Sequence, residues 1–246
     1  MDGRLARIIC DTSKRGGKII IPSFALERAQ EIVYALRRLE KDPEVPRLPV
    51  FVDSPMTVNI TEVFRLHPEC FDQPMRDFIS EEGDPFAAQH IHYVRRVEDS
   101  MKLNDLREPA IIISASGMCE SGRILHHLRN NCEDERNTIL IVGFQARNTL
   151  GRRIVEREKE IKIFGVKRPL NAEVQVLNGF SAHAGRSELI AFGNRFKDCA
   201  RDLLLVHGEE VVQGAEGHPG IQDRLVLAQP LDRRLADGEL VLDLPD

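Results

Sequence analysis

The sequence has no run of 18 consecutive apolar residues, which is about the length that a membrane-spanning helix requires. Residues 1–7 lack the charged and then apolar pattern of a secretory signal peptide. We therefore expect a cytoplasmic protein without a membrane partner. The motifs G-x-x-x-x-G-K-[ST], G-x-G-x-x-G and G-x-S-x-G are also absent, so the sequence does not support a nucleotide-cofactor enzyme or a serine hydrolase.

Cysteine is scarce and shows no paired spacing. The five cysteines are Cys10, Cys70, Cys119, Cys132 and Cys199. Their number is odd, their spacing is wide, and no C-x-x-C occurs. This pattern favours reduced thiols in the core over a disulfide framework or a cysteine zinc site.

The net charge of −5 excludes a protein whose whole surface is basic. Non-specific binding of nucleic acid depends on neutralising phosphate charge, so a nucleic-acid ligand requires a local basic groove. Three arginine pairs, at residues 37–38, 95–96 and 152–153, are candidates for such a groove. The alternative for each pair is a solvated helix face.

Apolar runs typical of strands alternate with stretches of helical spacing over the first two thirds of the chain. The runs are residues 18–22, 49–53, 110–114 and 138–143, and the helical stretches are residues 24–41, 56–66, 121–130 and 149–158. Ser54 and Pro55 add an N-cap and a proline in the first helical turn. This alternation predicts an α/β fold with a parallel, doubly wound sheet and helices on both faces.

After Lys159 the apolar runs lie closer together, which predicts a second α/β unit that begins near residue 165. Two of these runs end in a histidine beside small residues, His183 and His207, and a helical stretch at 186–197 separates them. If the two strands are neighbours, both imidazoles face one pocket at the carboxyl ends of the strands. The alternative is that each histidine bonds only to the backbone at the end of its own strand.

Six short motifs occur in a characteristic order: GGKIIIPSFAL (16–26), VDSPMT (52–57), SASGM (114–118), TLGR (149–152), FSAHA (180–184) and VHGE (206–209). They resemble motifs of the β-CASP branch of the metallo-β-lactamase-fold RNA nucleases, the group that includes ribonuclease J and the pre-mRNA 3′-end cleavage endonuclease. The resemblance implies that residues 1–164 form a β-CASP domain. It also implies that residues 165–246 form the C-terminal part of a metallo-β-lactamase αββα domain.

The resemblance further implies zinc-dependent hydrolysis of RNA, in which two zinc ions activate the attacking water. His207 matches a zinc ligand of the family. His183 matches the catalytic histidine near the scissile phosphate, a position suited to protonating the leaving oxygen. The residues that match or adjoin the family's RNA-binding positions are Ser114, Ser116, Gly117, Met118 and Ser181.

The sequence also departs from the family pattern. The main zinc motif, His-x-His-x-Asp-His, does not occur, so the resemblance implies that a metal-binding half is supplied by the same longer protein or by another chain. With one matched zinc ligand, the chain alone is expected neither to retain zinc nor to cleave RNA. A homodimer is a further arrangement that the sequence leaves open. Gly185 stands where many members have an aspartate that orients the histidine. The pairs at residues 90–92 and 126–127 do not replace the motif: an acid and a histidine do not follow the first, and adjacent helical side chains point about 100° apart.

Two hypotheses therefore follow. In the first, the chain is the β-CASP and C-terminal portion of a zinc-dependent RNA-processing nuclease, with RNA held between the two domains. In the second, it is a non-catalytic RNA-binding or assembly module that has lost the metal centre. Measured metal content distinguishes the two.

Overall fold

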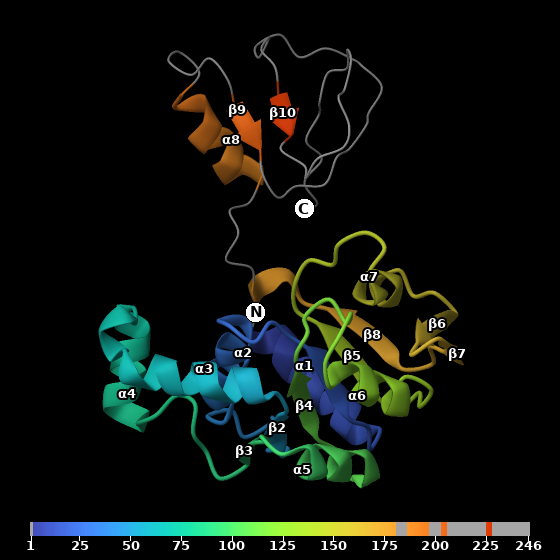
Figure 1. Cartoon of the computed structure of the whole chain (residues 1–246). Helices are drawn as coiled ribbons and strands as arrows, with labels where there is room; N and C mark the ends of the chain where they lie inside the picture. Colours follow the sequence, from blue (N-terminus) through green and yellow to red (C-terminus); the bar gives the residue numbers. More distant parts are fainter. Residues whose placement is uncertain (1, 181–185, 197–202, 206–224, 228–246) are drawn as a thin grey trace. The chain divides into compact units, whose positions relative to one another are not determined.

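A computed structural model describes residues 2–180, 186–196, 203–205 and 225–227 (Figure 1). The chain divides into two compact units, Met1–Ser181 and Ala182–Asp246. In the described part, no helix has the length and apolarity that a bilayer crossing needs.

The first unit is built on a six-stranded sheet with the strand order β3-β2-β4-β1-β5-β8. Its strands are β1 (Ile19–Pro22), β2 (Val50–Val52), β3 (Ile91–Tyr93), β4 (Ile111–Ser114), β5 (Thr138–Ile141) and β8 (Glu173–Val176). Every neighbouring pair in this sheet is parallel. The predicted α/β class is therefore confirmed, and the four apolar runs of the sequence correspond to β1, β2, β4 and β5.

Helices cover both faces of this sheet. They are α1 (Asp2–Lys14), α2 (Arg28–Leu39), α3 (Pro55–Leu66), α4 (Gln73–Glu82), α5 (Val97–Lys102), α6 (Ile124–Asn131) and α7 (Leu150–Val155), with short 3-10 turns η1 (Pro68–Cys70), η2 (Leu103–Asp105) and η3 (Asn178–Phe180). Ile19 and Ile21 pack with apolar residues of α1 and α2, whereas Ile20 packs with those of α6 and α7. Because successive strand residues face opposite sides, a sheet covered on both faces needs the unbroken Ile-Ile-Ile runs of β1 and β4.

Helix α1 was not predicted from the sequence. Its buried residues, Leu5, Ile8, Ile9 and Thr12, follow the spacing of one helical face. The predicted cap at Ser54 is present, since its side chain accepts a hydrogen bond from the Thr57 N–H at 3.3 Å.

The main sheet continues past residue 165. Strands β6 (Glu160–Ile163) and β7 (Val166–Pro169) form an antiparallel hairpin. Strand β8 then returns beside β5, with Val174 opposite Ile139. The sequence grouped residues 173–177 with the second unit, but the structure places β8 in the first sheet. The domain boundary at residues 164 and 165 stays a prediction.

The second unit contains helix α8 (Arg186–Asn194), which lies in the predicted helical stretch. It also contains strands β9 (Leu203–Leu205) and β10 (Leu225–Leu227), which pair in parallel. Strand β9 belongs to the apolar run that precedes His207.

The four cysteines in the described residues are free thiols. Cys119 and Cys132 are buried, Cys10 is half-buried and Cys70 is exposed. Burial raises the pKa of Cys119 to about 12 and that of Cys132 to about 11, so both thiols are protonated near neutral pH. Cys199 lies outside the described residues.

Candidate functional site

The carboxyl ends of the parallel strands gather the segments that the motifs single out. Strand β1 leads into Ser23, β2 into Asp53, β3 into Val94 and β5 into Val142. Strand β4 ends at Ser114 and leads directly into the loop at residues 114–118. In doubly wound sheets, ligands bind at this edge, so this loop is a candidate binding site.

Ser114 joins the ends of three strands. Its hydroxyl donates to the Asp53 carbonyl oxygen at 2.8 Å, and its own carbonyl accepts from the Ser23 N–H at 3.0 Å. The residue is 1% exposed. Its predicted role in RNA binding stays a prediction, and the structure adds a role in fixing where the loop begins.

The next residues form a turn with two free donors. The Ser116 N–H donates to the Ser121 carbonyl at 3.3 Å, and the Ser116 hydroxyl accepts from the Glu120 N–H at 3.2 Å. In contrast, the backbone N–H groups of Gly117 and Met118 have no hydrogen-bond acceptor among the described residues. Adjacent free N–H groups in a turn are suited to binding an anion.

The segment that follows β5 donates hydrogen bonds to carbonyl groups of the loop. Gln145 Nε2 donates to the Gly117 carbonyl at 3.0 Å, and the Gly151 N–H donates to the Met118 carbonyl at 3.1 Å. Gly151 has no room for a side chain, since a Cβ atom there would lie 1.7 Å from Gln145 Oε1. The Glu120 carboxylate accepts from the Leu150 N–H at 2.6 Å, so an acidic side chain already occupies the start of α7.

A buried polar cluster lies beneath the loop, centred on Asp53. The Asp53 carboxylate accepts from the Ser100 hydroxyl at 2.5 Å and from Arg123 Nη1 at 2.7 Å. Nε2 of His127 lies 2.6 Å from Asp53 Oδ2, the oxygen that also accepts from Ser100, whereas Arg123 bonds to Oδ1. Asp53 is 0% and His127 1% exposed. Burial alone would raise the pKa of Asp53, but hydrogen bonds from His127, Ser100 and Arg123 hold it below its ordinary value.

The Asp53 cluster also fixes the end of β3. Arg123 donates to the Val94 carbonyl at 3.2 Å and to the Arg95 carbonyl at 2.8 Å. The sequence assigned a structural role to His127, and its contact with Asp53 agrees with that. Asp53 itself was not predicted from the sequence, although an aspartate directly after a strand is a signal for a functional or structural polar site.

The three arginine pairs differ in their partners. Arg37 and Arg38 form ion pairs with Glu40 and Asp2, and Arg152 pairs with Glu156. Within the described part of the chain, the exposed Arg95 and Arg96 have no ion-pair partner; Arg95 bonds to the amide of Asn59. The pair at residues 95–96 is therefore the one that best fits a basic strip at the carboxyl edge.

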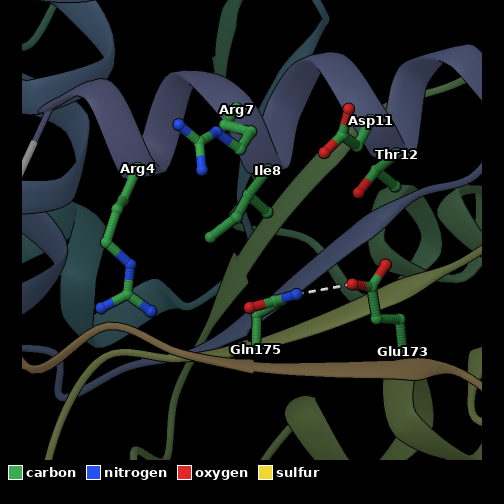
Figure 2. A pocket seen from close by; sticks show the side chains of 7 residues that line it. All are labelled: Arg4, Arg7, Ile8, Asp11, Thr12, Glu173 and Gln175. Atoms are coloured by element: carbon green, nitrogen blue, oxygen red, sulfur yellow. Dashed lines mark hydrogen bonds between the residues drawn. The ribbon is translucent and has the colours of Figure 1, made fainter.

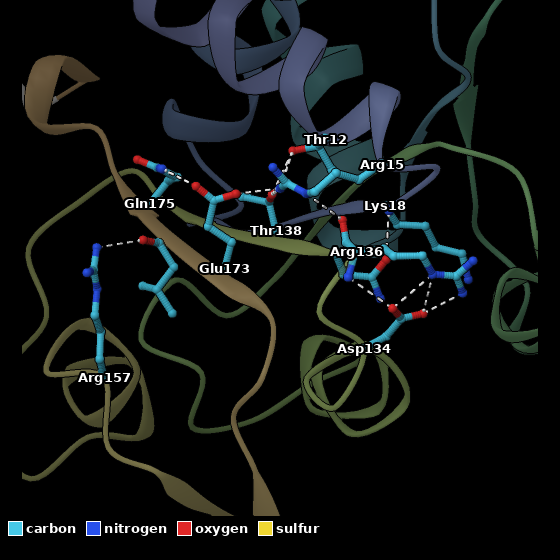
Figure 3. A network of polar contacts seen from close by, with 11 residues as sticks. Thr12, Arg15, Lys18, Asp134, Arg136, Thr138, Arg157, Glu173 and Gln175 are labelled. Atoms are coloured by element: carbon cyan, nitrogen blue, oxygen red, sulfur yellow. Dashed lines mark hydrogen bonds and ion pairs between the residues drawn. The ribbon is translucent and has the colours of Figure 1, made fainter.

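The opposite edge of the sheet carries charges that pair with each other (Figure 3). Arg15 pairs with Glu173 and donates to the Thr138 hydroxyl at 2.9 Å. Arg136 Nη2 lies 2.7 Å from Asp134, and this hydrogen bond lowers the pKa of Asp134. These pairs join the starts of β1, β5 and β8 and stabilise the fold.

A polar pocket of about 250 Å³ lies between α1 and the edge strand β8 (Figure 2). It is lined by Arg4, Arg7, Ile8, Asp11, Thr12, Glu173 and Gln175. Arg4 also donates to the Val176 carbonyl at 3.0 Å and so covers part of the free edge of β8. The pocket contains charges of both signs and none of the predicted site residues.

The described residues contain no group of three or more His, Cys, Asp or Glu side chains that fits a metal ion. Ser181, His183, Gly185 and His207 lie outside the described residues. The convergence of the two histidines therefore stays a prediction. The residues present in the described part do not by themselves fit a zinc site.

Comparison with known proteins gives two family matches. Residues 29–154 match the Beta-Casp domain, and residues 167–216 match the Zn-dependent metallo-hydrolase RNA specificity domain. The loop at residues 114–118 falls in the first match, and His183 and His207 fall in the second.

The chain is also similar to curated proteins along most of its length. It is 36% identical over 203 residues to "Ribonuclease TTHA0252" of Thermus thermophilus, which covers 82% of this chain and 46% of that protein. It is 35% identical over 212 residues to "Transcription termination factor FttA" of Methanocaldococcus jannaschii, and the match covers 84% of this chain and 33% of the relative. The chain thus spans less than half the length of either relative.

Proposed function

Because the chain belongs to the β-CASP family, we propose that it is the RNA-binding portion of a zinc-dependent RNA-processing nuclease that hydrolyses phosphodiester bonds. The observation that carries this proposal is the pair of free N–H groups at Gly117 and Met118, at the carboxyl edge of the sheet. In the complete protein, RNA lies between the β-CASP part and the metallo-β-lactamase part.

RNA recognition at this edge uses local charge. The N–H groups of Gly117 and Met118 donate to a phosphate oxygen, and the Ser116 hydroxyl lies in the same turn. Arg95 and Arg96 supply positive charge, and neither forms an ion pair within the described part of the chain, although Arg96 interacts electrostatically with Asp99. The net charge of −5 on the whole chain is compatible with such a local strip.

The chemical step needs residues from both histidine motifs. We assign His183 as the residue that protonates the leaving oxygen and His207 as one zinc ligand. Bound zinc supplies an activated water and neutralises charge on the phosphate. A zinc site needs about three or more protein ligands, so residues outside this sequence, in the same longer protein or another chain, complete it.

The first prediction tests the RNA-binding surface. We expect Ser116→Asp to weaken binding of a labelled single-stranded RNA at low salt by about tenfold or more, because the new carboxylate repels the phosphate. Fluorescence anisotropy measures the affinity, and raising the salt concentration should weaken binding of the wild-type chain. The matched control is Ser80→Asp on α4, which adds the same charge to an exposed position on another element.

Equal affinities for the wild type and both variants would refute the assignment of this loop. Loss of affinity in Ser80→Asp alone would place RNA on a different surface. The non-catalytic hypothesis uses the same RNA-binding loop, so this experiment bears on both hypotheses.

A further inference from the structure

The side chain of Phe24 lies against the proposed phosphate-binding loop. Its backbone position is fixed because the neighbouring Ser23 N–H donates to the Ser114 carbonyl at 3.0 Å. A Cβ atom added to Gly117 would lie 2.9 Å from Cδ2 and 3.0 Å from Cε2 of the Phe24 ring. The ring therefore packs against Gly117, and a side chain at residue 117 would require the ring to shift.

Phe24 is nevertheless 46% exposed, so one part of the ring is supported by Gly117 while another part is open to solvent. Proteins that bind single-stranded nucleic acid place such supported aromatic rings beside a groove for the backbone, and bases stack on them. The ring adjoins Gly117, and Gly117 and the next residue, Met118, carry the free N–H groups of the loop. A phosphate and a base of one RNA segment thus have neighbouring partners.

We propose that Phe24 is a base-stacking platform for unpaired RNA at the loop of residues 114–118. This inference rests on the proposed function, since it takes the loop to hold an RNA phosphate. Stacking accepts every base, because each base has an aromatic face. The substrate class is therefore single-stranded RNA with little preference for base identity, and a duplex, whose bases are already stacked, does not fit.

A protein surface is the other occupant that an exposed phenylalanine suggests. Leu26, Met56 and Phe144 are also exposed, at 61%, 65% and 49%, on segments that follow or adjoin the carboxyl ends of the strands. RNA is favoured because the ring adjoins free backbone donors and because Arg95 and Arg96 lack ion-pair partners within the described part. These features suit a polyanion better than an apolar protein surface.

The sequence offers a direct probe, because it contains no tryptophan. Phe24→Trp introduces a single indole whose fluorescence should be quenched when an RNA base stacks on it. Phe164→Trp is the matched control, since Phe164 is 51% exposed and lies between β6 and β7. We expect quenching by single-stranded RNA in the first variant, and no quenching together with wild-type affinity in the control.

Phe24→Leu removes the aromatic face and should weaken binding of single-stranded RNA by about tenfold, whereas Phe164→Leu should bind like the wild type. RNAs with one abasic site, placed at successive positions, identify the stacked base. When the abasic site is at that position, the wild type should bind the RNA more weakly than intact RNA. Phe24→Leu should bind this abasic RNA and intact RNA with equal affinity. Circular dichroism verifies that each variant is folded.

The outcomes separate this inference from the proposed function. If the wild type binds no RNA, the proposed function fails. If it binds RNA but Phe24→Leu binds equally well and Phe24→Trp is not quenched, the stacking role is overturned and the RNA-binding loop stands. If Phe24→Leu lowers the affinity for every abasic RNA as much as the affinity for intact RNA, Phe24 supports the loop or contacts protein and does not stack on a base. The inference is also wrong if duplex RNA binds as tightly as single-stranded RNA.

Discussion

Replacement of His183 by alanine in the complete nuclease is expected to slow RNA cleavage about a hundredfold or more while zinc content stays unchanged. This is the usual scale for the loss of a positioned proton donor. His183 lies outside the described residues, in the part of the chain matched to the Zn-dependent metallo-hydrolase RNA specificity domain. Because the defect lies in the chemical step, excess zinc should not restore the rate.

His207 is the matched comparison, since it is the histidine of the other motif, which follows β9 in the sequence. As a zinc ligand, its replacement by alanine should lower the occupancy of one zinc ion, and excess zinc should partly restore activity. Mass spectrometry of the intact protein gives the metal content, and single-turnover cleavage gives the rate. Zinc loss in His183→Ala together with full zinc in His207→Ala would reverse the two assignments.

Asp53→Asn is expected to lower the free energy of unfolding by about 3–5 kcal/mol at neutral pH. The substitution removes the charge that Arg123 faces and alters the hydrogen-bond partner of His127, and breaking a buried ion pair from one side leaves an uncompensated charge. Urea unfolding of the chain measures the effect. Asp77→Asn on α4 is the control, because Asp77 is exposed and forms no ion pair in the described part, so its loss should cost less than about 0.5 kcal/mol.

The effect of Asp53→Asn should also depend on pH. The folded-state pKa of Asp53 is lowered, so its contribution is fully present above the ordinary aspartate pKa and is lost as the pH falls through the lower folded value. The difference in unfolding free energy between the wild type and Asp53→Asn should therefore shrink on acidification. A difference that grows in acid, or a cost no larger than that of Asp77→Asn, would contradict the ionised state assigned to Asp53.

Local patterns were enough to predict most of the sheet. The runs that contain Ile19–Pro22 and Ile111–Ser114 are unbroken because the strands are buried on both faces, and this property is visible in the sequence itself. The place of β8 was not visible, since strand order depends on pairing between distant segments. The sequence pattern of residues 173–177 is similar to that of the strands that follow in the second unit. Nevertheless, β8, which lies in this stretch, pairs with β5 of the first sheet.

The site was predictable to a smaller extent. The motif at residues 114–118 indicated an anion-binding turn, and the structure adds which of its N–H groups are free. The Asp53 cluster was missed because its members are far apart in the chain: Ser100, Arg123 and His127 lie 47, 70 and 74 residues from Asp53. Spacing along a sequence cannot reveal such a cluster, whereas the fold brings it together beneath the loop.

Photo-crosslinking with RNA that carries 4-thiouridine, followed by mass spectrometry of the peptides, tests whether the carboxyl edge of the sheet binds single-stranded RNA. We predict that cross-links concentrate at residues 23–26 and 114–118 and that an excess of unlabelled single-stranded RNA removes them. Cross-links confined to the pocket around Arg4, Arg7 and Glu173, with none at residues 23–26 or 114–118, would contradict binding at this edge.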